Sequence, residues 1–138
     1  MRPPASSEAR SPEKDEDTVK NVIRIEELLL AGVSFYLFLA LDVAWWWYLL
    51  LFLAPDLSML GYLFGPKVGA WTYNLAHHKG LAVALFVMGG VASLPALQVA
   101  GLIMLGHSSL DRALGYGLKF SDAFQHTHLG MIGRASAG

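Results

Sequence analysis

A histidine and an aspartate that could share chemistry follow directly after the longest stretch of the chain without a charged residue, residues 80–106. They are His107 and Asp111, and Arg112 comes next to the aspartate. A helix places residues four positions apart on one face, so the imidazole and the carboxylate would point the same way. Imidazole nitrogens and carboxylate oxygens are ligands for zinc, iron and manganese. Ionisable groups at the edge of so apolar a segment indicate a functional site.

Two further residues are expected at the same place. If antiparallel helices meet at a turn centred near Leu94, His77 and Asp111 are equally far from that turn and lie at one depth. Asp56, at the end of an earlier apolar segment, reaches that depth as well. One hypothesis is that His77, His107 and Asp111 hold a divalent metal such as zinc, with Asp56 as a base on a bound water. The other is that these side chains satisfy one another by hydrogen bonds and ion pairs between helices.

Four more polar residues are candidates for the lining of this pocket. Asn74 is one helical turn before His77, and Arg112 is suited to a lipid phosphate or an acidic partner. The remaining two are Tyr62 and His128.

The elements that must position these residues are apolar helices. The chain of 138 residues is 54% hydrophobic and only 15% charged, with a mean hydropathy of +0.44. Soluble proteins average about 25% charged residues, and a small domain cannot bury so much apolar surface. We therefore expect an all-α integral membrane bundle of about four transmembrane helices, at residues 22–41, 43–54, 68–91 and 96–117. The third helix is either continuous or broken near residues 79–80.

The distribution of charge predicts the domain organisation and the orientation. Residues 1–20 are rich in Pro, Ser and charged residues and are expected to form a disordered cytoplasmic tail. Residues 21–133 form the transmembrane domain, and residues 134–138 form a flexible tail. Lys and Arg gather near both ends of the chain and are absent from the turns near Asp42 and Pro95. By the positive-inside rule, both termini are cytoplasmic and the protein is expected in the plasma (inner) membrane.

Several motifs in the same order resemble the domain of unknown function 4260 family. They are PDLSMLGY (residues 55–62), YNLAH (73–77), HSSLDR (107–112), LGYGLK (114–119) and THLG (127–130). The resemblance covers about residues 22–133. It implies a small bacterial integral membrane protein, and the family carries no assigned activity.

The expected function is that of a multi-pass membrane protein whose polar His/Asp pocket near the cytoplasmic face is structural or binds a small ligand or ion. The alternative is a divalent-metal-dependent membrane hydrolase that acts on a lipid head group or another phosphorylated or ester substrate. Haem binding by His77 and His107, and ion transport, are weaker alternatives. The expected partners are membrane lipids, and a homo-oligomer is compatible with the sequence. The net charge of −1 argues against nucleic acid, and the lack of cysteine excludes disulfides, thiolate zinc sites and iron–sulfur clusters.

Overall fold

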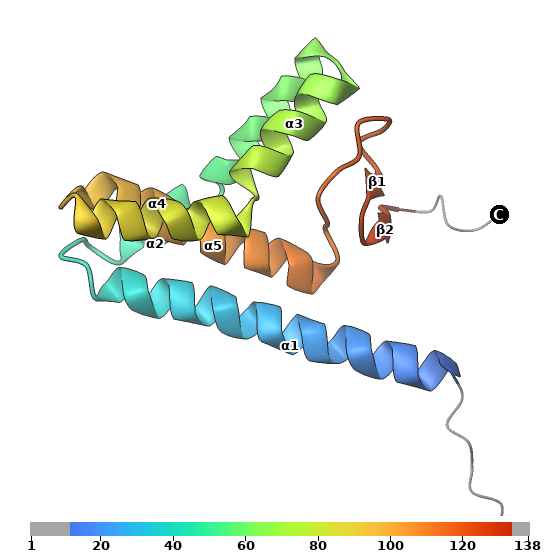
Figure 1. Cartoon of the computed structure of the whole chain (residues 1–138), viewed down its shortest axis with the longest axis horizontal. Coiled ribbons are helices and arrows are strands. Elements are labelled where there is room, and N and C mark those ends of the chain that lie inside the picture. The colour runs from blue at the N-terminus through green and yellow to red at the C-terminus, as the bar shows by residue number, and fades with distance from the viewer. Residues whose placement is uncertain (1–11, 134–138) are drawn as a thin grey trace, which may run out of the picture.

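The computed structural model describes residues 12–133, which form a helical protein with one small β-hairpin (Figure 1). The predicted all-α class is confirmed. In chain order the elements are α1 (Pro12–Leu39), α2 (Trp46–Leu51), the 3₁₀ helix η1 (Ala54–Phe64), α3 (Pro66–Ala76), α4 (Lys79–Val91), α5 (Pro95–Leu114), β1 (His126–Thr127) and β2 (Gly130–Met131). We call residues 115–133, which contain the hairpin, the C-terminal segment.

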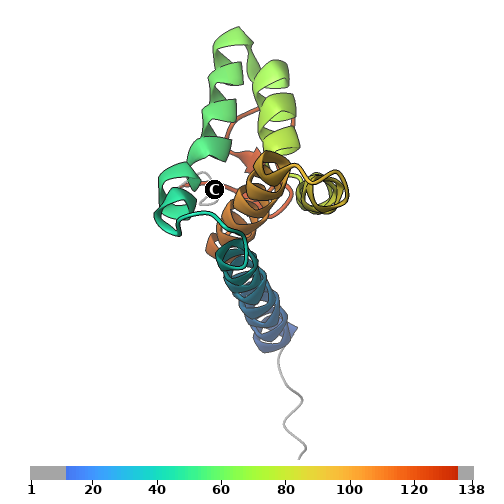
Figure 2. The same cartoon turned by 90° about the vertical axis from the view of Figure 1, so that its left-hand side faces the viewer.

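Helix α5 is the centre of the fold, since both α1 and α4 pack along it (Figures 1 and 2). The core between α1, α2 and α5 contains Phe38, Tyr48, Leu102 and Ile103, all buried. Ser34 links the helices by polar contacts, because its hydroxyl donates to the carbonyl of Leu102 at 2.6 Å and lies 2.9 Å from the hydroxyl of Tyr48. The core therefore fixes α1 against the helix that carries His107 and Asp111.

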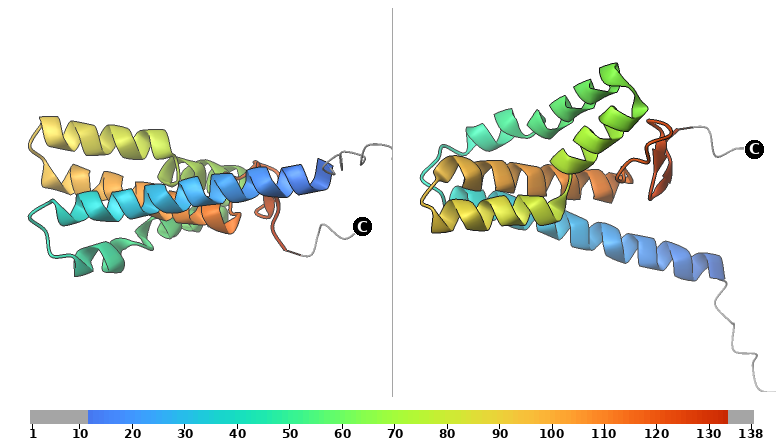
Figure 3. Two further views of the ribbon diagram at one scale, coloured as in Figure 1. Left: turned by 90° about the horizontal axis from the view of Figure 1, so that it is seen from below. Right: turned by 45° about the horizontal axis from the view of Figure 1, so that its top comes forward.

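The helix predicted at residues 43–54 does not end at Pro55. Proline is tolerated in the first turn of a helix, where its missing N–H has no intrahelical partner. Pro55 occupies that position in η1, so the helical path continues to Phe64. Gly65, with φ of 113°, then turns the chain into α3, which packs back against η1 (Figure 3). The η1–α3 pair holds Asp56 at one end.

The helix predicted at residues 68–91 is broken, which agrees with the second of the two alternatives, a broken rather than a continuous helix. Helix α3 ends at Ala76 and α4 begins at Lys79, with His77 and His78 between them. His78 caps α4, because its Nδ1 accepts a hydrogen bond from the N–H of Leu81 at 3.0 Å. The chain changes direction between α3 and α4 (Figure 3), and His77 lies at this joint.

Both ends of the fold differ from expectation. Residues 12–20, which were expected in the disordered tail, belong to α1. Acidic residues in the first turn of α1 and the Glu16–Lys20 ion pair at 2.7 Å favour the helix. The rest of that tail and residues 134–138 lie outside the described residues. Helix α5 stops at Leu114, earlier than predicted, because Gly115 adopts a left-handed conformation with φ of 95°.

One helical stretch among residues 12–133, Trp46–Phe64, is long and apolar enough to cross a membrane, judged by length and composition alone.

Candidate metal centre

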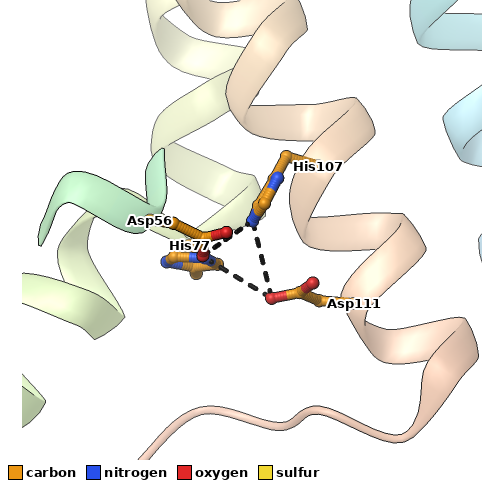
Figure 4. Close-up of side chains that lie close together, drawn as sticks. All are labelled: Asp56, His77, His107 and Asp111. Carbon is orange, nitrogen blue, oxygen red and sulfur yellow. Dashed lines mark hydrogen bonds and ion pairs between the residues drawn. The ribbon is translucent and has the colours of Figure 1, made fainter. Parts of the chain in front are cut away.

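Four side chains from three parts of the fold meet at the joint between α3 and α4 (Figure 4). Asp56 comes from the start of η1, His77 from the end of α3, and His107 and Asp111 from consecutive turns of α5. One nitrogen or carboxylate oxygen from each lies within 4.8 Å of the others. The expected convergence of these four residues is therefore present. We call them the His/Asp cluster.

Each histidine of the cluster lies between the two carboxylates. Nε2 of His77 is 3.5 Å from Oδ1 of Asp56 and 3.5 Å from Oδ2 of Asp111. Nε2 of His107 is 3.2 Å from the same oxygen of Asp56 and 3.7 Å from that of Asp111. The histidine side chains are 0% and 4% exposed, and those of Asp111 and Asp56 are 17% and 33% exposed. The imidazoles thus form the buried floor and the carboxylates the open side.

Tyr73 holds the cluster in two ways. Its carbonyl oxygen lies 2.8 Å from Nδ1 of His77, so it accepts a hydrogen bond from that nitrogen and leaves the lone pair of a neutral ring on Nε2. Its hydroxyl donates to Oδ2 of Asp111 at 3.0 Å. The tyrosine and histidine rings also stack, with centroids 3.8 Å apart. Sequence reasoning did not select Tyr73 as a site residue, although it is four residues before His77 on the same helix.

A cavity of about 190 Å³ opens onto the carboxylates of Asp56 and Asp111. Lys119 lies in its wall, only 5% exposed, with Nζ 4.7 Å from the centre of the Tyr73 ring. Burial lowers the pKa of Lys119 below its ordinary value, and the negative charges of the two aspartates oppose this shift. The cavity therefore combines two carboxylates with a partly desolvated amine.

Lys119 was also missed by the sequence analysis, because the C-terminal segment has no helical periodicity to place it. The structure anchors it through Asn74, one of the predicted pocket residues. The side-chain amide of Asn74 donates to the carbonyl of Lys119 at 2.8 Å and accepts from its N–H at 2.7 Å. Asn74 thus positions a wall of the cavity and lies outside the His/Asp cluster.

The other predicted pocket residues lie around the cluster without joining it. Tyr62 packs its ring against Phe124, which lines the cavity. Arg112 donates to the carbonyl of His77 at 3.3 Å, and His128 accepts from a backbone N–H of the C-terminal segment through Nδ1. Arg112 and His128 line a second, separate cavity. The structure therefore divides the single predicted pocket into two.

Comparison with known proteins gives one match. The family model described as domain of unknown function (DUF4260) matches residues 20–132. The chain belongs to this family. The matched range contains all four residues of the His/Asp cluster as well as Tyr73, Asn74 and Lys119. No curated protein and no solved structure matches the chain. Membership of the family therefore assigns no activity, and the chemistry must be argued from the site.

Proposed function

We propose that the His/Asp cluster binds a divalent metal ion, with zinc as the best fit. A tetrahedral zinc site with metal–ligand bonds of about 2.0–2.1 Å has neighbouring ligand atoms about 3.3 Å apart. The four nitrogen–oxygen distances of the cluster, 3.2, 3.5, 3.5 and 3.7 Å, lie close to that value, and all four ligand atoms lie within 4.8 Å of one another. This agreement is the observation that carries the proposal. A metal would enter between the four atoms with small side-chain movements.

The electrostatics of the cluster support the same conclusion. The two carboxylates form the open side of the cluster, so their mutual repulsion is partly screened by water and partly offset by the charge of Lys119, and a cation between them would remove the rest. Nε2 of His77 is buried and has no hydrogen-bond partner. Its Nδ1 is bound to the carbonyl of Tyr73, the arrangement that holds a ligating histidine in the tautomer and orientation needed by a metal. The alternative of mutual hydrogen bonding leaves this nitrogen unsatisfied.

We propose further that the protein is an integral membrane protein with four crossings. Large apolar side chains are exposed along its helices, including Leu57 and Trp71 at 67%, Leu63 and Phe64 at 80% and Val91 at 84%. So much exposed apolar surface is unusual for a soluble monomer. In this arrangement, α2 with η1 forms the second crossing, and α3 with α4 forms a broken third crossing. Broken helices are tolerated in membranes where they line a protein site.

The positions of the charges support cytoplasmic termini. The connection between α1 and α2 and the turn between α4 and α5 lie at one end of the molecule, opposite the C-terminal segment (Figures 1 and 3). No Lys or Arg occurs in residues 28–66 or 80–111. By the positive-inside rule, the end with the two connections faces away from the cytoplasm.

The orientation can be tested by cysteine labelling, because the natural chain contains no cysteine. A membrane-impermeant maleimide applied to intact cells should label Ala92→Cys, in the α4–α5 turn, and leave Ser121→Cys, in the C-terminal segment, unlabelled until the cells are opened. Both positions are exposed. Equal labelling of both variants in intact cells, or the reverse pattern, would contradict the proposed topology.

The metal proposal is tested by elemental analysis of the protein purified in detergent. We expect close to one zinc per chain after zinc loading and desalting, and loss of that zinc in His107→Ala. The matched control is His126→Ala, which removes an exposed histidine that pairs with Asp122. Equal zinc in the wild type and in His107→Ala would refute the site, provided that both proteins elute alike and have the same helical content.

A hydrolase is the second candidate, favoured by the cavity that opens onto Asp56 and Asp111. Asp56 is the most exposed member of the cluster, so its carboxylate would be the base that takes a proton from the attacking water, and a metal held by the other three side chains would polarise the ester. The water oxygen then adds to the ester, and the leaving alcohol takes up the proton. Asp56→Asn should retain most of the zinc and lose hydrolysis of a phosphate or carboxylate ester. Activity equal to the wild type in this variant would remove Asp56 from the mechanism.

A further inference from the structure

A second and larger cavity, of about 560 Å³, is lined by a different set of residues from the cavity beside the His/Asp cluster. Its wall is formed by α1, the start of α4, the end of α5 and the C-terminal segment. The ionisable residues that line it are Lys20, Arg24, Glu27, Lys79, Arg112 and His128. Four cationic side chains and one carboxylate therefore face the same space.

Only part of this positive charge is compensated by the protein. Nζ of Lys79 is 2.5 Å from Oε1 of Glu27, and Lys20 pairs with Glu16 at 2.7 Å. Within residues 12–133, the guanidinium of Arg24 makes no ion pair or hydrogen bond, and the guanidinium of Arg112 donates to the carbonyl of His77 with the charges of Glu27 and Asp111 nearby. Both guanidiniums therefore have N–H donors that the described residues do not use.

Arg112 is the most constrained of these cations. Nη2 is held by the carbonyl of His77 at 3.3 Å, whereas Nη1 is buried and has no hydrogen-bond partner. A buried donor without a partner costs free energy that a ligand acceptor would restore. His128 offers another donor: its Nδ1 accepts from the N–H of Leu118 at 2.8 Å, so a neutral ring carries its proton on Nε2.

We infer that this second cavity is a binding site for a phosphate group, which Arg24, Arg112 and His128 hydrogen-bond and Lys79 attracts. A guanidinium matches the oxygens of phosphate in pairs, and a phosphate has enough acceptors for several donors at once. Glu27 pairs with Lys79, and the two arginines give the cavity an excess of positive charge. Ile23 and Leu129 add apolar wall, which suits a phosphate at the end of a lipid. The cavity contains none of the four residues of the His/Asp cluster, although Arg112 donates to the carbonyl of His77.

The test uses the full chain in detergent and two probes: a fluorescent short-chain phosphatidic acid, followed by anisotropy, and inorganic phosphate as a competitor. We expect saturable binding of the lipid by the wild type. Arg24→Gln should weaken it by about tenfold or more, the effect of losing one charge-assisted contact. Arg24 is exposed on α1, so its replacement should leave the fold intact. The matched control is Lys67→Gln, which removes an exposed charge at the start of α3 and should bind like the wild type.

The outcomes separate the sources of phosphate. Competition by inorganic phosphate assigns the site to a free phosphate or its soluble esters, and failure to compete assigns it to a lipid head group; both support phosphate binding. Non-saturable binding, or equal weakening by Arg24→Gln and Lys67→Gln, would overturn the inference, since it would show general attraction to a basic surface. The zinc content of the same samples should not change, so failure of this site is distinguishable from failure of the metal centre.

Discussion

Replacing Tyr73 by phenylalanine removes the hydroxyl that orients Asp111 and leaves the rest of the cluster in place. The phenyl ring can keep its stacking on His77, and the backbone carbonyl that holds the Nδ1 of His77 is unchanged. The single loss is a hydrogen bond of 3.0 Å to a carboxylate. Such bonds contribute about 1.5–3 kcal/mol, and loss of a group that orients a metal ligand typically costs about 10- to 100-fold in affinity. These two estimates agree, because a tenfold change in affinity corresponds to about 1.4 kcal/mol and a 100-fold change to about twice that.

The assay is a competition titration of zinc against a chromophoric chelator, with the protein in detergent at fixed pH. We expect Tyr73→Phe to bind zinc about 10- to 100-fold more weakly than the wild type. Tyr116→Phe is the control, since this tyrosine lines the same cavity and its hydroxyl makes no hydrogen bond within residues 12–133. Equal zinc affinity in the wild type and Tyr73→Phe would refute the role given to Tyr73 and weaken the case that Asp111 is a ligand.

Three further predictions concern the fold around the site. Gly106→Ala places a methyl group against the buried hydroxyl of Tyr48 and should destabilise the protein by about 1–3 kcal/mol. The unfolding midpoint in detergent should therefore fall, and an unchanged midpoint would contradict the tight α1–α5 packing. Asn74→Ala should speed hydrogen exchange in the C-terminal segment, and unchanged exchange would show that other contacts hold it. His126 lowers the pKa of Asp122 chiefly by a hydrogen bond, which stabilises the fold above the ordinary pKa of Asp122 and is lost as the pH falls through the lowered value. His126→Ala should therefore raise that pKa in an NMR titration, and an unmoved pKa would contradict the contact.

The sequence predicts the cluster well because its main parts follow from helical spacing and antiparallel pairing. His107 and Asp111 share a face of α5, and equal separation from the turn near Leu94 brings His77 to the same level. The same periodicity places Tyr73 one turn before His77 on α3. Asp56 was placed by the end of an apolar segment, although the helical path continues beyond it.

The remaining features depend on tertiary contacts that a single sequence does not encode. Pro55 marks the beginning of a helix as well as it marks an end, so η1 could not be distinguished from a loop. Lys119 reaches the cavity only because Asn74 binds its backbone across the fold. The separation of the second cavity from the cavity beside the His/Asp cluster depends on the path of the C-terminal segment, which carries no periodic pattern.

The most direct test of the metal centre is X-ray absorption at the zinc edge of the loaded protein. We expect a first shell of nitrogen and oxygen at about 2.0–2.2 Å with the multiple-scattering signature of two imidazoles. In His107→Ala, which should lose the zinc, the two-imidazole signature should disappear. A shell without imidazole, or a spectrum that is the same in the wild type and the variant, would contradict the assignment of His77 and His107 as ligands.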